Sequence, residues 1–568
     1  MKKIYTTFLM TFILLNVYAQ QPTFDWAKRI GDNTLDLGQH IRVDNFGNVY
    51  SVGYFQGVVD FDPSALGVFN LTASGTSSHY IQKLDASGNF MWAKKIDGIN
   101  CTITSFDVDS NIYLVGHYQD STDFDPSPTT SQFLTDTASY ILKLNLLGDF
   151  VWVKSIKANH FSTIGLDGNS NLYLTGGFTD SVDFDPSFAN SFLLSTSIVN
   201  GATLFFLKLN SDGDFIWAKK INSGSTFVNS IAVEELGNFV VTGNYNGNVD
   251  FNPSDSVAFN LTSSISATYN CFTLKLDSNG DFMWANDINT FSYGYGASID
   301  FLGNVLVTGF YSETADFDPS LINTYNLTSD LTTNDIFVQK LDSSGNFIWA
   351  KSIGSNGDDE GYTISTDIVG SVYIGGIFGY TVDFDPSSSG TVSIVGNPNS
   401  AIGMFDGYIL KLDAGGNFNW VQHVGGNGST GVASLVMDSN VNVYSTGYFG
   451  GGVPTGSANF DESNSNFTLS STGNNPDAFV YKLSQPTIVS VNPNKFQEQS
   501  NSIFPNPTTG LVNLKGIDLK SNFLLYDLLG NSIKIENINS NNQIDISNLS
   551  NGVYFLSNGN KNYKIVKE

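Results

Sequence analysis

Cysteine and histidine are both scarce in this sequence of 568 residues. The two cysteines, Cys101 and Cys271, fall in different copies of an internal repeat, so a disulfide framework does not hold the protein together. The histidines lack the spacing of zinc ligands; they are His40, His79, His117, His160 and His423. Stability is therefore expected to come from packing, and no metal-binding residue is identified.

Motifs of common enzymes are also missing. There is no GxSxG, no HExxH and no phosphate-binding glycine loop. Glutamate is rare between residues 21 and 500, where it occurs only at Glu234, Glu235, Glu313, Glu360, Glu462 and Glu498. The sequence therefore identifies no catalytic residue and no cofactor-binding residue.

Basic residues are few, and the formal net charge is −27. Residues 21–500 contain 18 Lys and Arg against 48 Asp and Glu, whereas residues 501–568 contain 6 against 5. The strong excess of acidic residues at 21–500 argues against nucleic acid and anionic membranes as partners.

Long apolar runs are absent beyond the N-terminus. Residues 1–19 have Lys2 and Lys3, then an apolar run through Val17 and a small residue, Ala19, before Gln20, which is typical of a cleaved secretory signal peptide. A membrane anchor is the alternative, but the run is shorter than the ~20 residues that a span needs. No later segment is expected to cross a membrane. The 55 glycines and the lack of helical periodicity predict an all-β protein.

The sequence does contain an internal repeat with three markers. Copies of a stretch such as KLDSSGNFIWAK carry all seven tryptophans: Trp26, Trp92, Trp152, Trp217, Trp284, Trp349 and Trp420. DFDPS begins at Asp60, Asp123, Asp183, Asp316 and Asp383, with degenerate copies at Asp250 and Asn459. A Gly-x-aromatic step begins at Gly53, Gly116, Gly176, Gly243, Gly309, Gly376 and Gly447. The three markers agree on seven units.

Each unit has four short apolar segments joined by tight polar turns, which predicts four antiparallel strands. In the first unit they are 41–44, 49–55, 80–85 and 90–96, and a further short strand is expected at 69–72. Such sheets bury both faces by stacking radially. Residues 20–484 are therefore predicted to form a seven-bladed β-propeller, with an open solenoid as the alternative.

The two ends of the array predict how the ring closes. The seventh unit ends after its third strand, 478–483, and has no tryptophan strand of its own. The unmatched tryptophan strand is 24–30. Pairing between the two would close the ring and remove an exposed sheet edge.

The paired aspartates of DFDPS, such as Asp60 and Asp62, could bind Ca²⁺ because both carboxylates point the same way in an extended strand. The third strand of every unit also carries a lysine that could neutralise them: Lys83, Lys143, Lys208, Lys275, Lys340, Lys411 and Lys482. Turn capping is the third reading. We favour the lysine pairing and leave calcium and capping open.

These repeats resemble the bacterial β-propeller repeat family called SBBP over about residues 24–483. That family is defined by its repeat, so the resemblance implies the fold and no particular chemistry.

The C-terminal part has a different character. Residues 485–502 are polar and irregular and read as a linker. FPNPTTG at 504–510, YDLLG at 526–530, LSNGVY at 549–554 and KIVKE at 564–568 resemble the type A C-terminal sorting domain of the type IX secretion system. For residues 503–568 the resemblance implies an immunoglobulin-like β-sandwich that directs export across the outer membrane of a Bacteroidota-type cell.

Two functions remain open at this stage. One is a secreted or surface-attached binding module for a glycan or protein, and the other is an exported polysaccharide-degrading enzyme. An enzyme needs acid and base residues that break the repeat. The sequence identifies no such catalytic residue, so we favour binding. The most divergent segments, 390–407 and 450–457, are the best candidates for ligand contact.

Overall fold

The computed structural model describes residues 21–485 with short gaps, and parts of 502–567. The gaps are 45, 97–98, 108–110, 188, 197, 199–200, 255–256, 264–268, 321, 331–332, 398–402 and 462–466; in the C-terminal part, 505–507, 516–523, 527–531, 534–541, 550–551 and 558–561 are also left out. The predicted signal peptide and almost all of the predicted linker lie outside the described residues. The chain divides into two compact units between Pro486 and Thr487.

The first unit is built from seven antiparallel sheets, numbered here as blades 1 to 7; six are four-stranded, and in blade 6 two further short strands extend the four to a six-stranded sheet. Blade 1 has the order β2 (Leu37–Val43), β3 (Val49–Phe55), β6 (Ser78–Leu84) and β7 (Phe90–Ile96). Blade 2 contains β8 (Ile99–Phe106), β9 (Ile112–Tyr118), β12 (Ala138–Leu144) and β13 (Phe150–Ile156). Blade 3 contains β14 (His160–Leu166), β15 (Leu172–Phe178), β18 (Thr203–Leu209) and β19 (Phe215–Ile221).

The later blades keep this order of strands. Blade 4 contains β20 (Thr226–Val233), β21 (Phe239–Tyr245), β24 (Asn270–Leu276) and β25 (Phe282–Ile288). Blade 5 contains β26 (Ser292–Ile299), β27 (Val305–Tyr311), β30 (Asp335–Leu341) and β31 (Phe347–Ile353). Blade 6 contains β32 (Glu360–Thr366), β33 (Val372–Phe378), β36 (Asp406–Leu412) and β37 (Phe418–Gly426).

Blade 7 closes the ring as predicted. Its sheet has the order β38 (Ser429–Met437), β39 (Val443–Gly451), β42 (Asp477–Ser484) and β1 (Thr23–Ile30). The pairing of Trp26 with Lys482 and of Ile30 with Ala478 fixes the register of β1 on β42. The strand from the start of the ring therefore completes its last blade, and the solenoid alternative is wrong.

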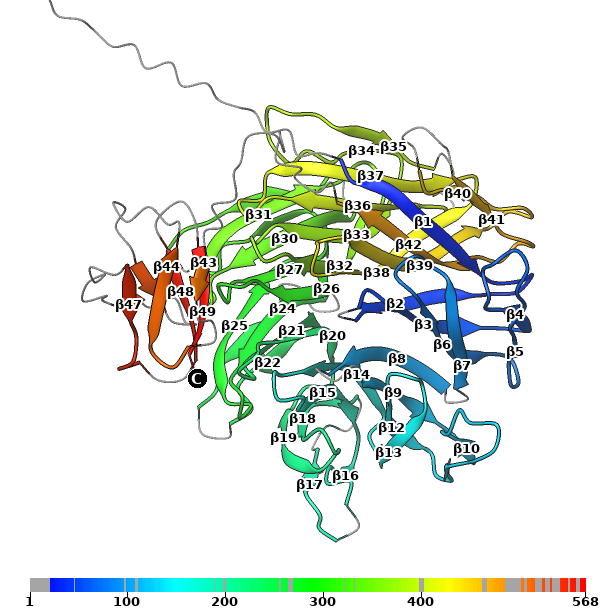
Figure 1. The fold of residues 1–568 in the computed structure, drawn as a ribbon, viewed down its shortest axis with the longest axis horizontal. Coiled ribbons are helices and arrows are strands. Elements are labelled where there is room, and N and C mark those ends of the chain that lie inside the picture. The colour runs from blue at the N-terminus through cyan, green and yellow to red at the C-terminus, as the bar shows by residue number, and fades with distance from the viewer. Residues whose placement is uncertain are drawn as a thin grey trace, which may run out of the picture. The chain divides into compact units, whose positions relative to one another are not determined.

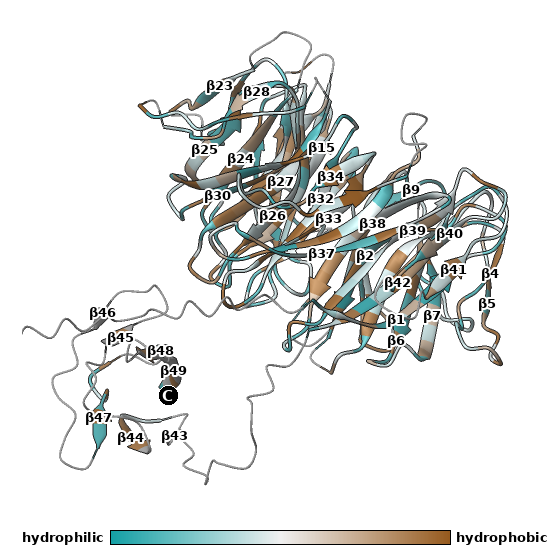
Figure 2. Ribbon diagram, turned by 90° about the horizontal axis from the view of Figure 1, so that it is seen from above, coloured by the Kyte–Doolittle hydropathy of each residue, from teal (hydrophilic) through white to brown (hydrophobic). Residues whose placement is uncertain are grey.

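The first strand of each blade contacts the first strand of the next blade, so these strands ring the propeller axis (Figure 1). The ribbons of the blades carry hydrophobic stretches (Figure 2). Buried side chains form seven core clusters, each shared by two neighbouring blades, including one that joins Trp26 and Tyr444 of blade 7 to Tyr80 of blade 1. The core of this propeller thus lies between blades.

The glycine of the Gly-x-aromatic step lets the first two strands of a blade approach closely. A Cβ on Gly53 would lie 1.9 Å from the carbonyl oxygen of Leu37, and one on Gly309 would lie 1.8 Å from that of Tyr293. Any side chain would therefore push the first strand away from the second.

Short hairpins extend each unit between its second and third strands. They are β4 (Val58–Asp60) with β5 (Asn70–Thr72), β10 (Thr122–Asp123) with β11 (Phe133–Leu134), β16 (Ser181–Asp183) with β17 (Leu193–Ser195), β22 (Asn248–Asp250) with β23 (Asn260–Thr262), β28 (Thr314–Asp316) with β29 (Asn326–Thr328), β34 (Thr381–Asp383) with β35 (Ser393–Val395), and β40 (Ser457–Asn459) with β41 (Thr468–Ser470). We call them rim hairpins. The last one also pairs with β37, which links unit 7 to blade 6.

The second unit has two antiparallel sheets. One contains β43 (Ser502–Phe504), β44 (Leu511–Lys515) and β47 (Gln543–Asp545), and the other contains β45 (Leu524–Tyr526), β46 (Ser532–Ile533), β48 (Gly552–Ser557) and β49 (Asn562–Lys567). Both sheets contribute to one buried cluster that includes Val512, Ile544, Leu525 and Leu556. In the described residues of the chain there is no helix, and so none long and apolar enough to cross a membrane.

Candidate functional site

The third-strand lysines contact a carboxylate other than the predicted one. Lys340 Nζ lies 2.9 Å from Asp300 Oδ2, and Lys275 Nζ lies 2.6 Å from Glu234 Oε1. Lys83, Lys143, Lys208 and Lys411 face Asp44, Asp107, Asp167 and Asp367 in the same way, and Lys482 pairs with Asp25. The predicted pairing with DFDPS is therefore wrong. DFDPS belongs to the rim hairpins, whereas the partners of six of these lysines lie in the turn that joins the first two strands of a blade, and the partner of Lys482 lies in β1.

The same lysines and the tryptophans connect neighbouring blades. Lys143 Nζ donates to the carbonyl oxygen of Ser211 in the next blade at 3.1 Å, and Trp217 Nε1 donates to that of Ser278 at 3.2 Å. The glycine of that next turn leaves room for the indole, since a Cβ on Gly280 would lie 2.8 Å from Trp217. The KLDSSGNFIWAK stretch is thus a structural connector between blades.

The DFDPS aspartates cap the rim hairpins. Asp316 Oδ1 accepts hydrogen bonds from the backbone N–H groups of Asp318 at 3.0 Å and Tyr325 at 2.7 Å. Asp318 Oδ1 in turn accepts from the N–H of Ser320 at 2.9 Å. These contacts match the capping alternative. In the described parts of the chain, no group of three or more His, Cys, Asp or Glu side chains is placed to share one metal ion.

His117 of blade 2 and His160 of blade 3 interact electrostatically, whereas His79 and His423 lie in blades 1 and 6. Burial lowers the pKa of His79 to about 4, and burial also lowers the pKa of His117 and His160. His423 Nε2 lies 2.9 Å from Asp406 Oδ2 inside blade 6. Cys271 is a free, buried cysteine, and the side chain of Cys101 lies outside the described residues.

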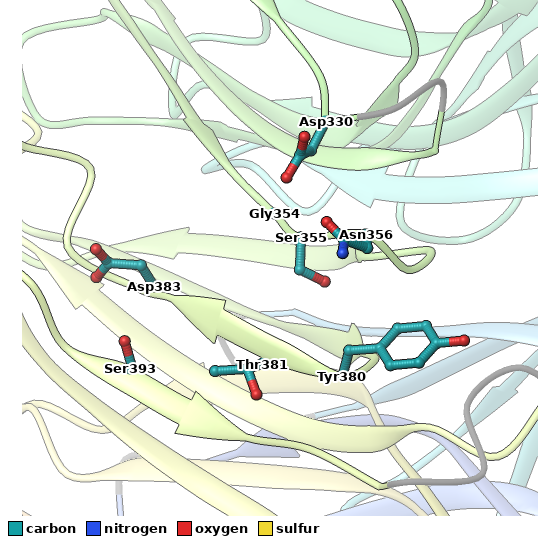
Figure 3. Close-up of a pocket in the computed structure, with 8 residues that line it drawn as sticks. All are labelled: Asp330, Gly354, Ser355, Asn356, Tyr380, Thr381, Asp383 and Ser393. Carbon is teal, nitrogen blue, oxygen red and sulfur yellow. The ribbon is translucent and has the colours of Figure 1, made fainter.

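A pocket of about 560 Å³ lies between blades 5 and 6, and sequence reasoning did not identify it as a site. Blade 5 and its connection to blade 6 supply Asp330, Gly354, Ser355 and Asn356, and the rim hairpin of blade 6 supplies Tyr380, Thr381, Asp383 and Ser393 (Figure 3). The lining combines carboxylates, hydroxyls, an amide and one aromatic ring, with no basic side chain. Its volume suits a small polar ligand or part of a chain.

Tyr380 has an unusual backbone conformation for its size. Its φ is 53°, in the left-handed region, and the residue is 39% exposed. Other units place small or acidic residues at this position, also with positive φ: Gly57, Asp120, Asp180, Gly247 and Glu313. A bulky residue there costs about 1–2 kcal/mol relative to glycine. A strained aromatic residue at the edge of a pocket is a reason to look for a ligand.

Two buried aspartates accept hydrogen bonds from the loops that line the pocket. Asp359 Oδ2 accepts from the backbone N–H of Ser355 at 2.7 Å and from its hydroxyl at 3.0 Å. Asp335 Oδ2 accepts from the N–H of Asp330 at 3.2 Å. Burial raises the pKa of Asp335 to about 7 and that of Asp359 well above its usual range. Neither residue lines the pocket, so both position the loops that do.

One of the divergent segments contributes to this pocket. Ser393 belongs to residues 390–407, whereas residues 450–457 supply no lining residue. Tyr380 could have been found from the sequence, because it lies two residues after the repeated aromatic Phe378 and interrupts a series of small and acidic residues. The contributions of Asp330 and Asn356 required the structure.

Residues 502–568 match the family described as a secretion system C-terminal sorting domain. This domain indicates export by the type IX secretion system to the cell surface or beyond it.

The body has more distant likenesses. The chain is 25% identical over 510 residues to an uncharacterized WD repeat-containing protein of Acanthamoeba polyphaga mimivirus, which covers 75% of this chain and 36% of that protein. The chain thus spans little more than a third of the length of this relative.

Among solved structures, Sqt1 from Chaetomium thermophilum is 9% identical with a TM-score of 0.24, covering 82% of this chain and 100% of that one. The extracellular domain of BT4673 from B. thetaiotaomicron is 11% identical with a TM-score of 0.19, covering 96% and 98%. Neither score is high enough to support an argument from the likeness.

Proposed function

We propose that this type IX-exported propeller is a non-catalytic binding protein at the cell surface or in the medium, and that the pocket between blades 5 and 6 binds a glycan. The observation that carries the proposal is Tyr380, a strained and partly exposed aromatic residue beside hydroxyl, amide and carboxylate groups. Sugar rings present C–H groups that pack on aromatic faces and hydroxyls that hydrogen-bond to such polar groups.

Several structural details support binding over catalysis. The acids with the most strongly raised pKa values near the pocket, Asp335 and Asp359, are buried and hydrogen-bonded to the loops. Asp383 is engaged as a turn cap, because its Oδ1 accepts from the N–H groups of Asp385 at 3.1 Å and Val392 at 2.7 Å. A glycosidase needs two carboxyl groups that face the substrate.

The proposal includes four features expected from the sequence. A signal peptide at 1–19 would start export, and the repeats would belong with the SBBP type. The tail unit would be an immunoglobulin-like sandwich, for which the two antiparallel sheets that share one buried cluster give support. The source would be a Bacteroidota-type cell.

The test uses the exported protein on immobilised neutral and acidic polysaccharides, with retention and soluble product measured together. Tyr380→Gly removes the ring and relieves the left-handed strain, so it should abolish retention while the protein stays at least as stable. Glu313→Gly, at the same position of blade 5, is the matched control and should bind like the parent. Product release that is lost in Asp330→Asn would overturn the binding proposal in favour of an enzyme. Retention on immobilised proteins but on no glycan would show that the ligand is a protein and not a glycan.

A further inference from the structure

The innermost strands carry a second set of residues that break the repeat. In six blades the first strand has a bulge opposite the second strand, where one extra residue interrupts the register. The residues at the bulge differ between most of these blades; they are Gln39, Ser162, Asn229, Tyr295, Tyr362 and Ala433. Because the first strands ring the axis, this position places one side chain from each of the six blades near the centre, and in blades 5 and 6 it is a tyrosine.

Blades 5, 6 and 7 place tyrosines together at this level. The rings of Tyr295 and Tyr362 have centroids 5.5 Å apart and planes at 73°. Tyr295 also lies 6.1 Å from the ring of Tyr293. The ring of Tyr448 of β39 lies over Gly431 of β38, the strand that contacts β32. All of these tyrosines are partly exposed. They form an aromatic surface from three separate blades.

Glu360 is the carboxylate of this surface. It begins β32, is partly exposed, and interacts electrostatically with Tyr362, two residues along the same strand. Burial, with a smaller contribution from the negative charge of Asp358, raises its pKa to about 7. Across the described residues, no lysine or arginine pairs with Glu360. A partly buried carboxylate surrounded by aromatic rings lacks the positive charge that would stabilise it.

We propose that Tyr295, Tyr362, Tyr448 and Glu360 form a binding site for an organic cation, of the alkylated ammonium class. Aromatic faces attract such cations when the charge lies within about 6 Å of the ring centroid, and several rings with one carboxylate make the usual cage. A metal ion is a poorer fit, because a hard cation needs several carboxylate or carbonyl oxygens and, in the described parts of the chain, no three His, Cys, Asp or Glu side chains are placed to share one ion. The acidic body, with a net charge of −27 for the chain, also attracts cations from a distance.

The groups that face Glu360 determine how binding depends on pH. They are Asp358 and Asp359 of the preceding loop, Tyr295 of β26, Tyr362 of β32, Tyr408 of β36 and Tyr448 of β39. The pKa of each tyrosine is raised by burial, so all four stay neutral through the physiological range. Loss of the Glu360 proton is then expected to strengthen cation binding as the pH rises from about 5 to 8.

The experiment titrates the full chain with choline, with tetramethylammonium, and with 3,3-dimethylbutan-1-ol, a neutral molecule of the shape of choline. Both cations should bind saturably by calorimetry, and the alcohol should bind about three- to thirtyfold more weakly. Glu360→Gln should weaken choline binding and remove its pH dependence. Tyr362→Leu should also weaken it, whereas Tyr362→Phe, which keeps the ring, should bind nearly as well as the parent.

The matched control is Tyr54→Leu, because Tyr54 of β3 occupies the repeat position of Tyr448 in blade 1. It should leave choline binding unchanged. Equal affinity for choline and the alcohol would overturn the proposal, as would the absence of saturable binding for both cations. Thermal melts of all variants show whether they are folded, and the Tyr362→Phe and Glu360→Gln pair tests the site even if Tyr362→Leu unfolds.

Discussion

Lys482 Nζ donates a hydrogen bond of 3.0 Å to the carbonyl oxygen of Ala86, which is 396 residues earlier in the chain. Lys143 and Lys208 make the corresponding bond to the next blade along the chain. Trp26, which pairs with Lys482 across β1 and β42, also donates to Ala86 at 3.3 Å. The junction between blades 7 and 1 therefore uses the same contacts as an ordinary pair of neighbours.

Trp26→Ala is expected to destabilise the whole propeller. Trp26 is only 7% exposed and belongs to the core cluster between blades 7 and 1, so its removal should lower the free energy of unfolding by about 3–5 kcal/mol. Urea unfolding followed by tryptophan fluorescence and circular dichroism measures this. Phe46→Ala, at a side chain that is 83% exposed, is the control. A Trp26→Ala protein with the stability of the parent would show that the closing strand carries little of the fold's stability.

Lys340→Met should lower the free energy of unfolding much more than the loss of a surface ion pair would. The side chains of Lys340 and Asp300 are 6% and 2% exposed, so the substitution leaves a buried carboxylate unpaired, at a cost of about 3–5 kcal/mol. Lys219→Met is the comparison, because its partner Asp281 is 64% exposed and the expected cost is about 0–1 kcal/mol. Similar midpoints of chemical unfolding for the two variants would contradict the connector role.

Chelation should not change the melting temperature. The DFDPS aspartates cap backbone N–H groups. Asp316→Ala should therefore lower the free energy of unfolding by about 1–2 kcal/mol, with or without EDTA. Asp316→Asn keeps an acceptor oxygen and should cost less. If EDTA lowered the melting temperature and Ca²⁺ restored it, the calcium alternative would be correct.

Stability should fall as the pH rises from about 4 to 7. Burial raises the pKa of Asp36 and of Asp335 to about 7, from 3.8 in the unfolded chain, so the folded protein binds more protons in this window. The stabilisation that protonation of these two carboxyls provides is fully present below pH 3.8 and is lost as the pH rises through about 7. Melting temperatures across this range measure the slope. Asp36→Asn should reduce it, and an unchanged slope would mean that this carboxyl does not titrate as described.

Removing residues 502–568 should leave a folded propeller that is not exported. The two compact units divide between Pro486 and Thr487, and the sorting domain lies wholly in the second. Fractionation of cells that express the shortened chain is expected to find it in the periplasm, with the melting temperature of the parent propeller. Display at the parent level would mean that another part of the chain directs export.

The fold was more predictable than the site because each blade corresponds to one copy of the sequence repeat. The spacing of the tryptophans and the unpaired copy at Trp26 were enough to predict both seven blades and the closing strand. The lysine partner was missed because two acidic positions repeat in every unit, and the sequence alone cannot show whether Lys83 faces Asp44 or Asp60. The pocket and the aromatic surface arise from single residues of different blades, such as Asp330 with Tyr380, and folding alone brings them together.

The position of β1 also determines when the ring can be completed. This strand is synthesised first, yet its partner β42 follows about 450 residues later, as the 448-residue separation of Arg29 and Asp477 illustrates. Until β42 is available, β1 has an open edge that can pair with another chain. The sorting domain comes after β42, so any chain that has acquired its export signal already contains every strand of the ring. Chain order thereby prevents the secretion machinery from receiving a propeller that lacks a blade.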